Sequence, residues 1–312
     1  MRKNILITGG SGFLGTNLAI KLKTKYKVYL GSRNNHLNNI ASNDTGCESV
    51  PLDITNIESL RNIISSIKPN IIIHAAATKY VQLSEKHPFE TVDININGSF
   101  NVLRVANEMN VETLIGVSTD KTAPPVLNIY GLSKSIMERI FCSNKNNKIN
   151  VACVRFGNIA WSTGSVFNIW TNMVKKNNLI LSTGPHMRRY FFNVDEASDL
   201  VITAINKIKL INGKILVKDM KSAQIKDILE VWCNKYNCKW EKINERIGDK
   251  IDEYLIGESE LKHTRKKLIN NEKYYVIDFS KNNLTDLKLP ISSKTSKKLS
   301  KSEIIKLIKN EK

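Results

Sequence analysis

The run Tyr130-Gly-Leu-Ser-Lys134 places a phenol and an ammonium group four residues apart. On a helix, this spacing puts both side chains on one face, one turn apart. A cation beside a phenol lowers the pKa of the phenol, so that Tyr130 can take a proton from a hydroxyl group. Such pairs also occur by chance on surface helices. The pair alone therefore indicates only a candidate site for hydride-transfer chemistry.

A second polar group precedes this pair. A predicted strand over residues 113–118 runs into Ser-Thr-Asp-Lys at 118–121. The carboxyl ends of strands in a doubly wound sheet form the ligand crevice, so we expect these side chains near Tyr130. Without Tyr130 beside them, a solvated ion pair would be the better interpretation of Asp120 and Lys121.

A glycine-rich turn lies at the start of the chain. Gly9-Gly-Ser-Gly12-Phe-Leu-Gly15 follows a predicted strand over 4–8 and precedes a predicted helix over 16–24. Glycines let the backbone turn tightly and approach a pyrophosphate, which then lies at the positive end of the helix. In this context the motif predicts a nicotinamide dinucleotide site.

Residues 31–34, at the end of the second predicted strand, bear on which cofactor is bound. NAD sites usually carry an acidic residue here, which holds the ribose 2′-hydroxyl. This chain has Ser32 and Arg33 and no carboxylate, and a guanidinium suits a 2′-phosphate. NADP is therefore favoured over NAD, with a solvated loop charge as the alternative for Arg33. Asp53, after the third strand, is either a contact of the adenine amine or an ordinary turn residue.

Alternating strand and helix patterns position these groups. Strands are predicted over 4–8, 27–31, 49–52, 71–74, 113–118 and 150–155, and helices over 16–24, 57–66, 89–109 and 130–143. This repetition predicts an α/β fold with a Rossmann-type, doubly wound parallel sheet. The expected organisation is a dinucleotide-binding domain over 1–156 with a returning helix at about 194–207, a smaller lobe over 157–281 that is mainly substrate-binding, and a basic C-terminal tail over 282–312. Within the tail, residues 302–308 can form a short amphipathic helix.

Composition favours a soluble cytoplasmic protein. The chain has 312 residues, 41% of them hydrophobic, and no apolar run reaches the length of a membrane-spanning helix. The N-terminus passes into a strand and is not a signal peptide. The five cysteines lack metal-binding spacing, so we expect reduced thiols and no metal site. The net charge of +18 is spread along the chain, which favours an anionic small substrate over nucleic acid.

Taken together, the motifs resemble the extended short-chain dehydrogenase/reductase superfamily. Thr-Asp-Lys at 119–121 with Tyr130 and Lys134 is similar to the inverting UDP-N-acetylglucosamine 4,6-dehydratases of the polysaccharide biosynthesis family. Further similar stretches lie at 74–81, 155–166, 183–190 and 248–253. The resemblance therefore covers nearly the whole chain.

The resemblance implies three groups of site residues. The catalytic group is Thr119, Asp120, Lys121, Tyr130 and Lys134. The cofactor group is Gly9, Gly12, Phe13, Leu14, Gly15, Ser32, Arg33, Asp53, Ile54, Ala75, Ala76, Ala77, Tyr130 and Lys134. The substrate group is Lys79, Asn158, Arg189 and Lys250. Within it, Arg189 would pair with the diphosphate, and ordinary loop roles are the alternative for the other three.

The implied reaction is an elimination without net redox change. Tyr130 takes the proton of the sugar 4-hydroxyl while Thr119 holds the oxygen, and hydride leaves C4 for the nicotinamide and later returns at C6. Lys121, if its pKa is depressed, takes the C5 proton, and Asp120, if protonated, protonates the departing 6-hydroxyl. Reprotonation from the opposite face gives an inverted 4-keto-6-deoxy sugar nucleotide for surface glycan biosynthesis.

Some residues depart from the family pattern. Trp161 and Thr163 stand where glycine and arginine are usual, and Arg188 replaces a threonine. The exact hexose, nucleotide and C5 stereochemistry therefore stay open. A nucleotide-sugar 4-epimerase or 4-reductase on the same scaffold is the closest alternative, and an NADP-sensing binding protein is the non-enzyme alternative. Relatives assemble as dimers to hexamers, so we expect a homo-oligomer.

Overall fold

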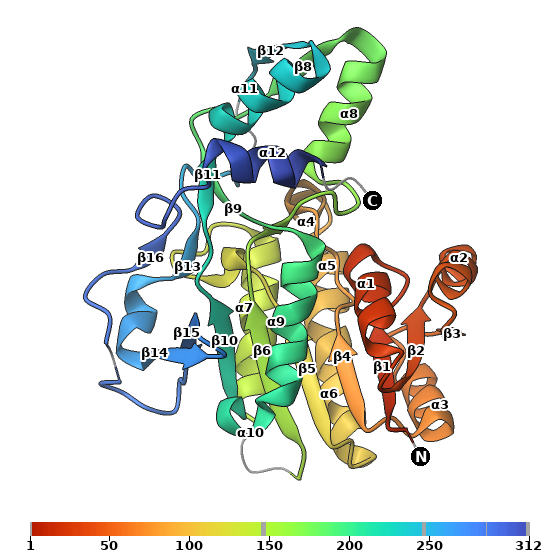
Figure 1. Ribbon diagram of the computed structural model, residues 1–312. Helices are drawn as coiled ribbons and strands as arrows, with labels where there is room; N and C mark the ends of the chain where they lie inside the picture. The colour runs from red at the N-terminus through yellow and green to blue at the C-terminus, as the bar shows by residue number, and fades with distance from the viewer. Residues whose placement is uncertain (1, 145–147, 245–247, 285, 310–312) are drawn as a thin grey trace.

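The computed structural model describes residues 2–144, 148–244, 248–284 and 286–309. Across these residues, the main sheet has nine strands in the order β14-β15-β10-β6-β5-β4-β1-β2-β3 (Figure 1). The parallel strands are β1 Asn4–Thr8, β2 Lys27–Ser32, β3 Glu48–Pro51, β4 Ile71–His74, β5 Thr113–Val117, β6 Asn150–Arg155 and β10 Lys214–Lys218. An antiparallel hairpin of β14 (Thr264–Ile269) and β15 (Glu272–Ile277) completes one edge. The predicted Rossmann-type sheet is confirmed.

Helices cover both faces of this sheet, which explains why its central strands are continuous apolar runs. On one face α1 (Phe13–Leu22) packs against α9 (Val194–Asn206), with α2 (Asn35–Thr45) beside α1. The other face carries α3 (Ile57–Ile67), α6 (Gly98–Glu108) and α7 (Ile129–Cys142), each in contact with the next. The short helices α4 (Val81–Lys86) and α5 (Pro88–Val92) lie between β4 and α6, and α10 (Ile208–Ile211) lies between α9 and β10.

The single helix expected over 89–109 is interrupted. A π-helical turn at Asp93–Asn97 separates α5 from α6. Asn95 of this turn is fully buried; its amide group donates to Thr78 O (3.0 Å) and Ser133 Oγ (2.9 Å) and accepts from Thr78 N (2.8 Å). Through these bonds, Asn95 of the π-helical turn joins the segment after β4 to helix α7.

A smaller lobe stands above the carboxyl edge of the sheet (Figure 1). It contains α8 (Val166–Asn177), α11 (Ile225–Tyr236), α12 (Lys301–Lys309) and the parallel pair β8 (Leu179–Ser182) and β12 (Lys239–Lys242). Aromatic rings form its core, with the ring centroid of Trp232 5.6 Å from Trp161 and 5.5 Å from Trp170. Small sheets connect the two parts: β7 (Asn158–Ile159), β9 (Arg188–Phe192) and β11 (Ser222–Gln224), and β13 (Tyr254–Ile256) with β16 (Ile291–Ser292).

Two expected boundaries differ from this arrangement. Residues 157–281 supply β10, β14 and β15 to the main sheet as well as much of the lobe. The segment expected as a basic tail, 282–312, contains α12, whose Ile304 and Ile308 are buried in the aromatic core. Trp161 Nε1 donates to Leu307 O (3.0 Å) and holds this helix. Hydrophobic burial therefore makes the segment part of the lobe; its residues 285 and 310–312 lie outside the described part.

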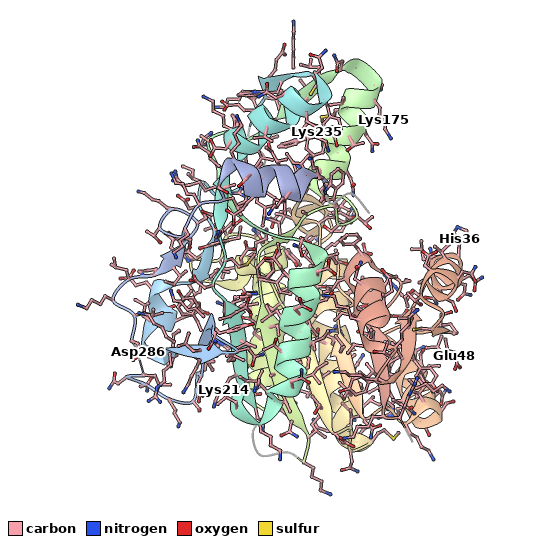
Figure 2. The ribbon with its side chains drawn as sticks, in the orientation of Figure 1. His36, Glu48, Lys175, Lys214, Lys235 and Asp286 are labelled. Carbon is pink, nitrogen blue, oxygen red and sulfur yellow. The ribbon has the colours of Figure 1, made fainter. Side chains whose placement is uncertain are left out.

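The positive charge is dispersed over the molecule. Figure 2 shows Lys175 and Lys235 on the smaller lobe, while Lys214 lies at the start of β10, at the opposite end of the molecule. Many lysines are paired with acidic side chains, such as Lys218 with Glu272 (3.0 Å). Within the described residues, no helix combines the length and the apolar character that crossing a membrane requires.

Candidate active site

The turns that carry most of the predicted site residues follow the carboxyl ends of the parallel strands, beneath the smaller lobe (Figure 1). β1 has β2 on one side and β4 on the other, so the chain reverses direction at this point of the sheet. Crevices at such switch points are the usual ligand sites of open α/β sheets. The glycine turn follows β1, residues 75–79 follow β4, and a 3₁₀ turn at Asp120–Thr122 follows β5.

The glycine turn has the shape that a dinucleotide requires. Gly9 has φ +72°, and a Cβ on it would lie 2.7 Å from Ala76 N. A Cβ on Gly15 would lie 2.6 Å from Gly10 O, so α1 packs directly on the turn. In the described chain, no side chain caps the first N–H groups of α1, which begins at Phe13 after Gly12. These donors are free for a pyrophosphate, and the residues fit the predicted cofactor.

The adenosine end of the site is built around β2. The Ser11 and Ser32 hydroxyls are 2.6 Å apart, and Ser32 Oγ donates to Asn38 Oδ1 (2.6 Å), which ties the glycine turn to the end of β2. Arg33 is exposed, and no hydrogen bond or ion pair to its guanidinium is found among the described residues, so it is accessible to an anion. Asp53 Oδ1 accepts from Thr55 N (2.9 Å) and Oγ1 (2.8 Å), so in this structure it closes a turn.

The floor of the site is the end of β4. His74 is fully buried, with Nδ1 2.8 Å from Thr8 Oγ1 and Nε2 2.9 Å from Ser99 Oγ. Burial, followed by the charge of Lys134, lowers the pKa of His74 to about 3. The ring is therefore neutral and has both nitrogens occupied. Ala75, Ala76 and Ala77 come next; Ala75 N donates to Thr8 O (3.0 Å), and Ile54 packs beneath Gly98.

The start of α7 fixes the position of Tyr130. Asn128 caps the helix by accepting from Gly131 N (2.8 Å), and Glu85 Oε1 accepts from Ile129 N (2.7 Å). A Cβ on Gly131 would lie only 2.3 Å from Lys121 O. The glycine therefore allows the first turn of α7 to touch the 3₁₀ turn that carries the polar residues after β5.

The cation that acts on Tyr130 is Lys121. Burial raises the pKa of Tyr130, while the charge of Lys121 and a hydrogen bond with Thr119 lower it. Lys134 Nζ instead lies 3.0 Å from Met137 Sδ, and burial lowers the pKa of Lys134 to about 8. Lys134 is not among the groups that shift the pKa of Tyr130, and its catalytic role stays a prediction, because helical spacing fixes the face of a residue and leaves its rotamer open.

Asp120 and Lys121 form a buried ion pair. Asp120 is fully buried, and its Oδ1 accepts from Lys121 Nζ (2.9 Å) and Thr119 Oγ1 (3.1 Å). Its Oδ2 has no hydrogen-bond partner among the described residues. Burial opposes the charge of Lys121, but Asp120 and Glu253 outweigh it, so the pKa of Lys121 is raised. The depressed pKa expected of a resting base is not present.

Two of the four substrate candidates lie against this cluster. Arg189 Nε is 3.9 Å from Glu253 Oε1, and its Nη1 donates to Arg188 O (2.9 Å). Lys250 is buried, donates to Pro125 O, and is close enough to Asp120 and Lys121 to feel their charges.

The other two substrate candidates lie further out. The Asn158 amide donates to Tyr190 O (3.1 Å) and so holds β9. Lys79 is exposed, with its ammonium 5.5 Å from the centre of the Tyr80 ring. Arg188, which departs from the family pattern, forms a two-point ion pair with Asp252 (2.6 and 2.7 Å).

A buried charge network behind the site has no counterpart among the predicted residues. Arg155 is fully buried and donates to both carboxylate oxygens of Glu138 (3.0 and 2.7 Å) and of Glu260 (2.8 Å each). Glu138 also accepts from Ser118 Oγ (2.6 Å) and Thr122 Oγ1 (3.2 Å), on either side of the Thr-Asp-Lys triplet. These residues are far apart in the chain, so no local pattern reveals them.

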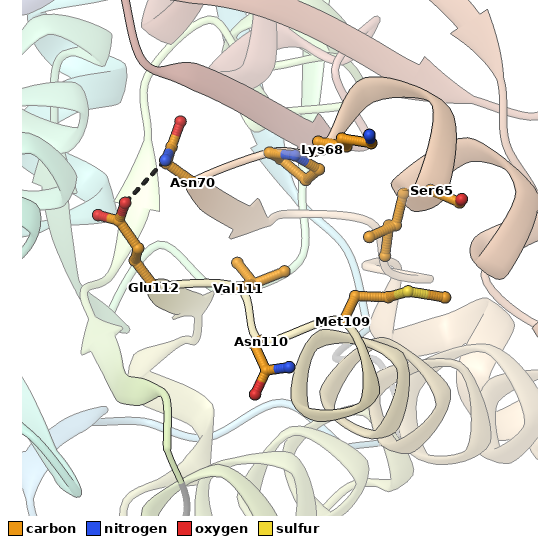
Figure 3. A pocket seen from close by; sticks show the side chains of 9 residues that line it. Ser65, Lys68, Asn70, Met109, Asn110, Val111 and Glu112 are labelled. Atoms are coloured by element: carbon orange, nitrogen blue, oxygen red, sulfur yellow. Dashed lines mark hydrogen bonds between the residues drawn. The ribbon is translucent and has the colours of Figure 1, made fainter.

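A separate hollow, seen in Figure 3, lies beside the amino ends of β4 and β5. Its volume is about 350 Å³, and it is lined by residues 64–65, 68–70 and 109–112. Glu112 accepts from Asn70 Nδ2 (2.7 Å) and is thereby occupied. The hollow is remote from every predicted site residue. Within the described residues, no cluster of His, Cys, Asp and Glu could hold a metal ion.

Fold and site define a short-chain dehydrogenase/reductase of the extended, Rossmann-type class. More specifically, the chain belongs to the polysaccharide biosynthesis protein family, whose profile matches residues 5–278. It is similar to the structure of Pen from Bacillus thuringiensis, with a TM-score of 0.90 and 26% identity over 100% of this chain and 98% of that one. The expected family is confirmed.

Curated relatives carry several names. The capsular polysaccharide biosynthesis protein CapD of Staphylococcus aureus is 32% identical over 83% of this chain and 46% of its own length, so this chain spans about half of that relative. The inverting UDP-N-acetylglucosamine 4,6-dehydratase of Campylobacter jejuni is 28% identical over 88% of this chain and 83% of that protein. A UDP-glucose 4-epimerase of Rickettsia bellii is 30% identical over 83% and 79%. Relatives of this kind support an enzyme acting on a nucleotide sugar.

Proposed function

We propose that this protein is a C5-inverting nucleotide-sugar 4,6-dehydratase that converts UDP-N-acetylglucosamine to a 4-keto-6-deoxy product for surface glycan biosynthesis. The observation that carries the proposal is the buried Asp120–Lys121 pair (2.9 Å) next to Tyr130. An elimination needs a base at C5 and an acid at the 6-hydroxyl in addition to the group at the 4-hydroxyl. A 4-epimerase needs only the group at the 4-hydroxyl.

The ion pair can supply both the base and the acid. Transfer of one proton from Lys121 Nζ to Asp120 Oδ1, along their existing hydrogen bond, breaks one N–H bond and forms one O–H bond. The result is a neutral amine that can take the C5 proton and a carboxylic acid that can protonate the departing oxygen. The raised pKa of Lys121 keeps this proton on Nζ in the resting protein. We propose that the transfer occurs only with substrate bound; the pair as a whole already contains the proton that it needs.

Tyr130 would act first, on the 4-hydroxyl. Burial raises the pKa of its phenol, while Lys121 and Thr119 lower it and so favour the phenolate form that takes the proton. When bound, the nicotinamide would accept hydride from C4 and return it at C6. We propose NADP as the cofactor, with Arg33 on the 2′-phosphate, and NAD as the alternative that direct binding measurements distinguish.

The sugar nucleotide would bind between the sheet and the smaller lobe, which we propose as the substrate-binding part of the chain. Arg189 and Lys250 are the cations beside the reacting cluster, and a guanidinium suits a diphosphate. Lys79 and Asn158 are the peripheral candidates.

We further propose that the protein is a homo-oligomer. Exposed apolar side chains mark the surface of neighbouring helices α5, α6 and α7: Phe89 (90% exposed), Val92, Phe100, Leu132 and Ile136. Apolar groups of this kind at one surface suit contact with a second copy. Light scattering after gel filtration tests this, and a monomer at micromolar concentration would contradict it.

The reaction is tested by incubating UDP-N-acetylglucosamine with the NADP-loaded protein and measuring the product mass. A dehydratase gives a product lighter by one water, whereas an epimerase leaves the mass unchanged; relatives of both names support retaining the 4-epimerase as the second candidate. Lys121→Ala is expected to abolish water loss and to keep cofactor binding. Normal turnover by that variant would overturn the proposed mechanism.

A further inference from the structure

Glu253 is a buried carboxylate that the proposed reaction leaves unused. It directly precedes β13 and is 3% exposed. Its Oε1 lies 3.8 Å from Lys121 Nζ, and its Oε2 has no hydrogen-bond partner among the described residues. A buried acceptor without a partner costs free energy. This cost indicates that Glu253 has a role other than packing.

The backbone around Glu253 is firmly held. Glu253 N donates to Ser293 Oγ (3.0 Å), and Ser293 N donates to Glu253 O (2.8 Å). These bonds join the segment before β13 to β16, so the carboxylate is placed from a different part of the chain than Asp120. Lys121 therefore lies between two carboxylates, one from its own turn and one from the C-terminal region.

The surroundings of Glu253 contain charges of both signs. The titratable groups that face Glu253 and Lys121 come from the 3₁₀ turn, α7, β9 and the segment before β13: Asp120, Tyr130, Arg189 and Lys250. Burial raises the pKa of Glu253, and Lys121 lowers it in opposition. Because Glu253 shares this enclosed space with the reacting pair, a change in its charge acts directly on both members.

We propose that Glu253 is a positioning residue that holds Lys121 as an ammonium between two carboxylates and thereby keeps one proton on the Asp120–Lys121 pair. The geometry favours this role because a negative charge 3.8 Å away stabilises the ammonium. The same negative charge also opposes loss of this proton from the pair to solvent, because losing it would leave Asp120 and Glu253 as two buried carboxylates without a cation between them. The part of this inference that concerns catalysis rests on the proposed dehydratase function; the effect on Lys121 does not.

The titration of Lys121 tests the inference without substrate. Protein labelled with ¹³C at the lysine ε carbon is titrated by NMR, and the Lys121 signal is assigned from its loss in Lys121→Arg. In Glu253→Gln, the midpoint of Lys121 is expected to fall by at least about one pH unit, since one opposite charge at about 4 Å is removed. Glu253→Asp keeps the charge at a greater distance and is expected to give an intermediate midpoint, which also serves if Glu253→Gln does not fold.

Asp252→Asn is the matched control. Asp252 is the neighbouring carboxylate, but it pairs with Arg188 (2.6 Å) and is not among the groups with the largest effect on the pKa of Lys121. An unchanged midpoint is expected there. Equal midpoints in wild type, Glu253→Gln and Glu253→Asp would overturn the inference, as would an equal fall in Asp252→Asn.

Turnover gives a second, separate readout. The alkaline limb of the pH profile of kcat/KM for water loss reports loss of the shared proton, and it should move to lower pH in Glu253→Gln. If the wild type forms no dehydrated product from any nucleotide sugar, the proposed function fails while the NMR titration still decides the role of Glu253. If the wild type turns over and the limb stays in place, Glu253 does not act on the pair.

Discussion

A single methyl group added at Gly131 should separate Tyr130 from the Asp120–Lys121 pair without altering any reacting side chain. The new Cβ would lie 2.3 Å from Lys121 O, whereas ordinary contacts begin at 3.4 Å. The first turn of α7 and the 3₁₀ turn must therefore move apart by about 1 Å. A displacement of that size costs roughly 100-fold in rate when reacting groups must be aligned, and the overpacking destabilises the fold by about 1–3 kcal/mol.

The assay compares kcat for water loss and the unfolding midpoint of Gly131→Ala with those of Gly46→Ala. Gly46 ends α2 with φ +68° and has no atom within 4 Å of an added Cβ, so that variant loses about 1–2 kcal/mol from backbone strain alone. We expect a large fall in kcat only for Gly131→Ala, with cofactor affinity retained. Wild-type kcat in Gly131→Ala would refute the idea that this contact sets the alignment.

Three further predictions concern the adenosine end of the cofactor site and two buried polar groups. Arg33→Ala should weaken NADP binding by about tenfold or more with little change for NAD, measured by fluorescence titration of both cofactors; an equal loss for both would remove the 2′-phosphate role. Arg155→Met should destabilise the protein by about 3–5 kcal/mol, because Glu138 and Glu260 are left buried without their cation, and chemical denaturation showing less than about 1 kcal/mol would contradict the network. The third prediction concerns His74, whose folded-state pKa of about 3 lies below its unfolded value, so stability present above about pH 6.5 is lost as the pH falls toward 3. His74→Gln should remove about 2 kcal/mol of the difference in unfolding free energy between pH 7 and pH 5, and an identical pH dependence in both proteins would count against a neutral buried ring.

Local patterns in the chain predict much of this protein. The glycine turn at Gly9–Gly15, the strand before it and the helix after it can be read directly, because each depends on neighbouring residues and a short backbone geometry. The same holds for the position of Tyr130 on α7 and of Asp120 at the end of β5. Hydrophobic patterns likewise predict which segments form the parallel strands, since a fully covered sheet requires apolar runs.

Local patterns could not predict how side chains choose partners across the fold. Lys134 and Lys121 are both close to Tyr130 in sequence, but only the packed structure shows that Lys121 supplies the charge and that Lys134 turns toward Met137. The amphipathic helix expected over 302–308 forms as α12, but only the packed structure shows that its apolar side completes the aromatic core of the lobe.

Glu253 and Arg155 show most clearly what local sequence patterns leave undetermined. Each lies far along the chain from the residues on which it acts, and neither stands in a motif that specifies its partner. The charge state of Lys121 depends on which carboxylates are buried within about 4 Å of it, because electrostatic interactions are strong only where water is excluded. Sequence determines the elements and the reacting groups, and tertiary structure alone determines the distances and burial that set their protonation.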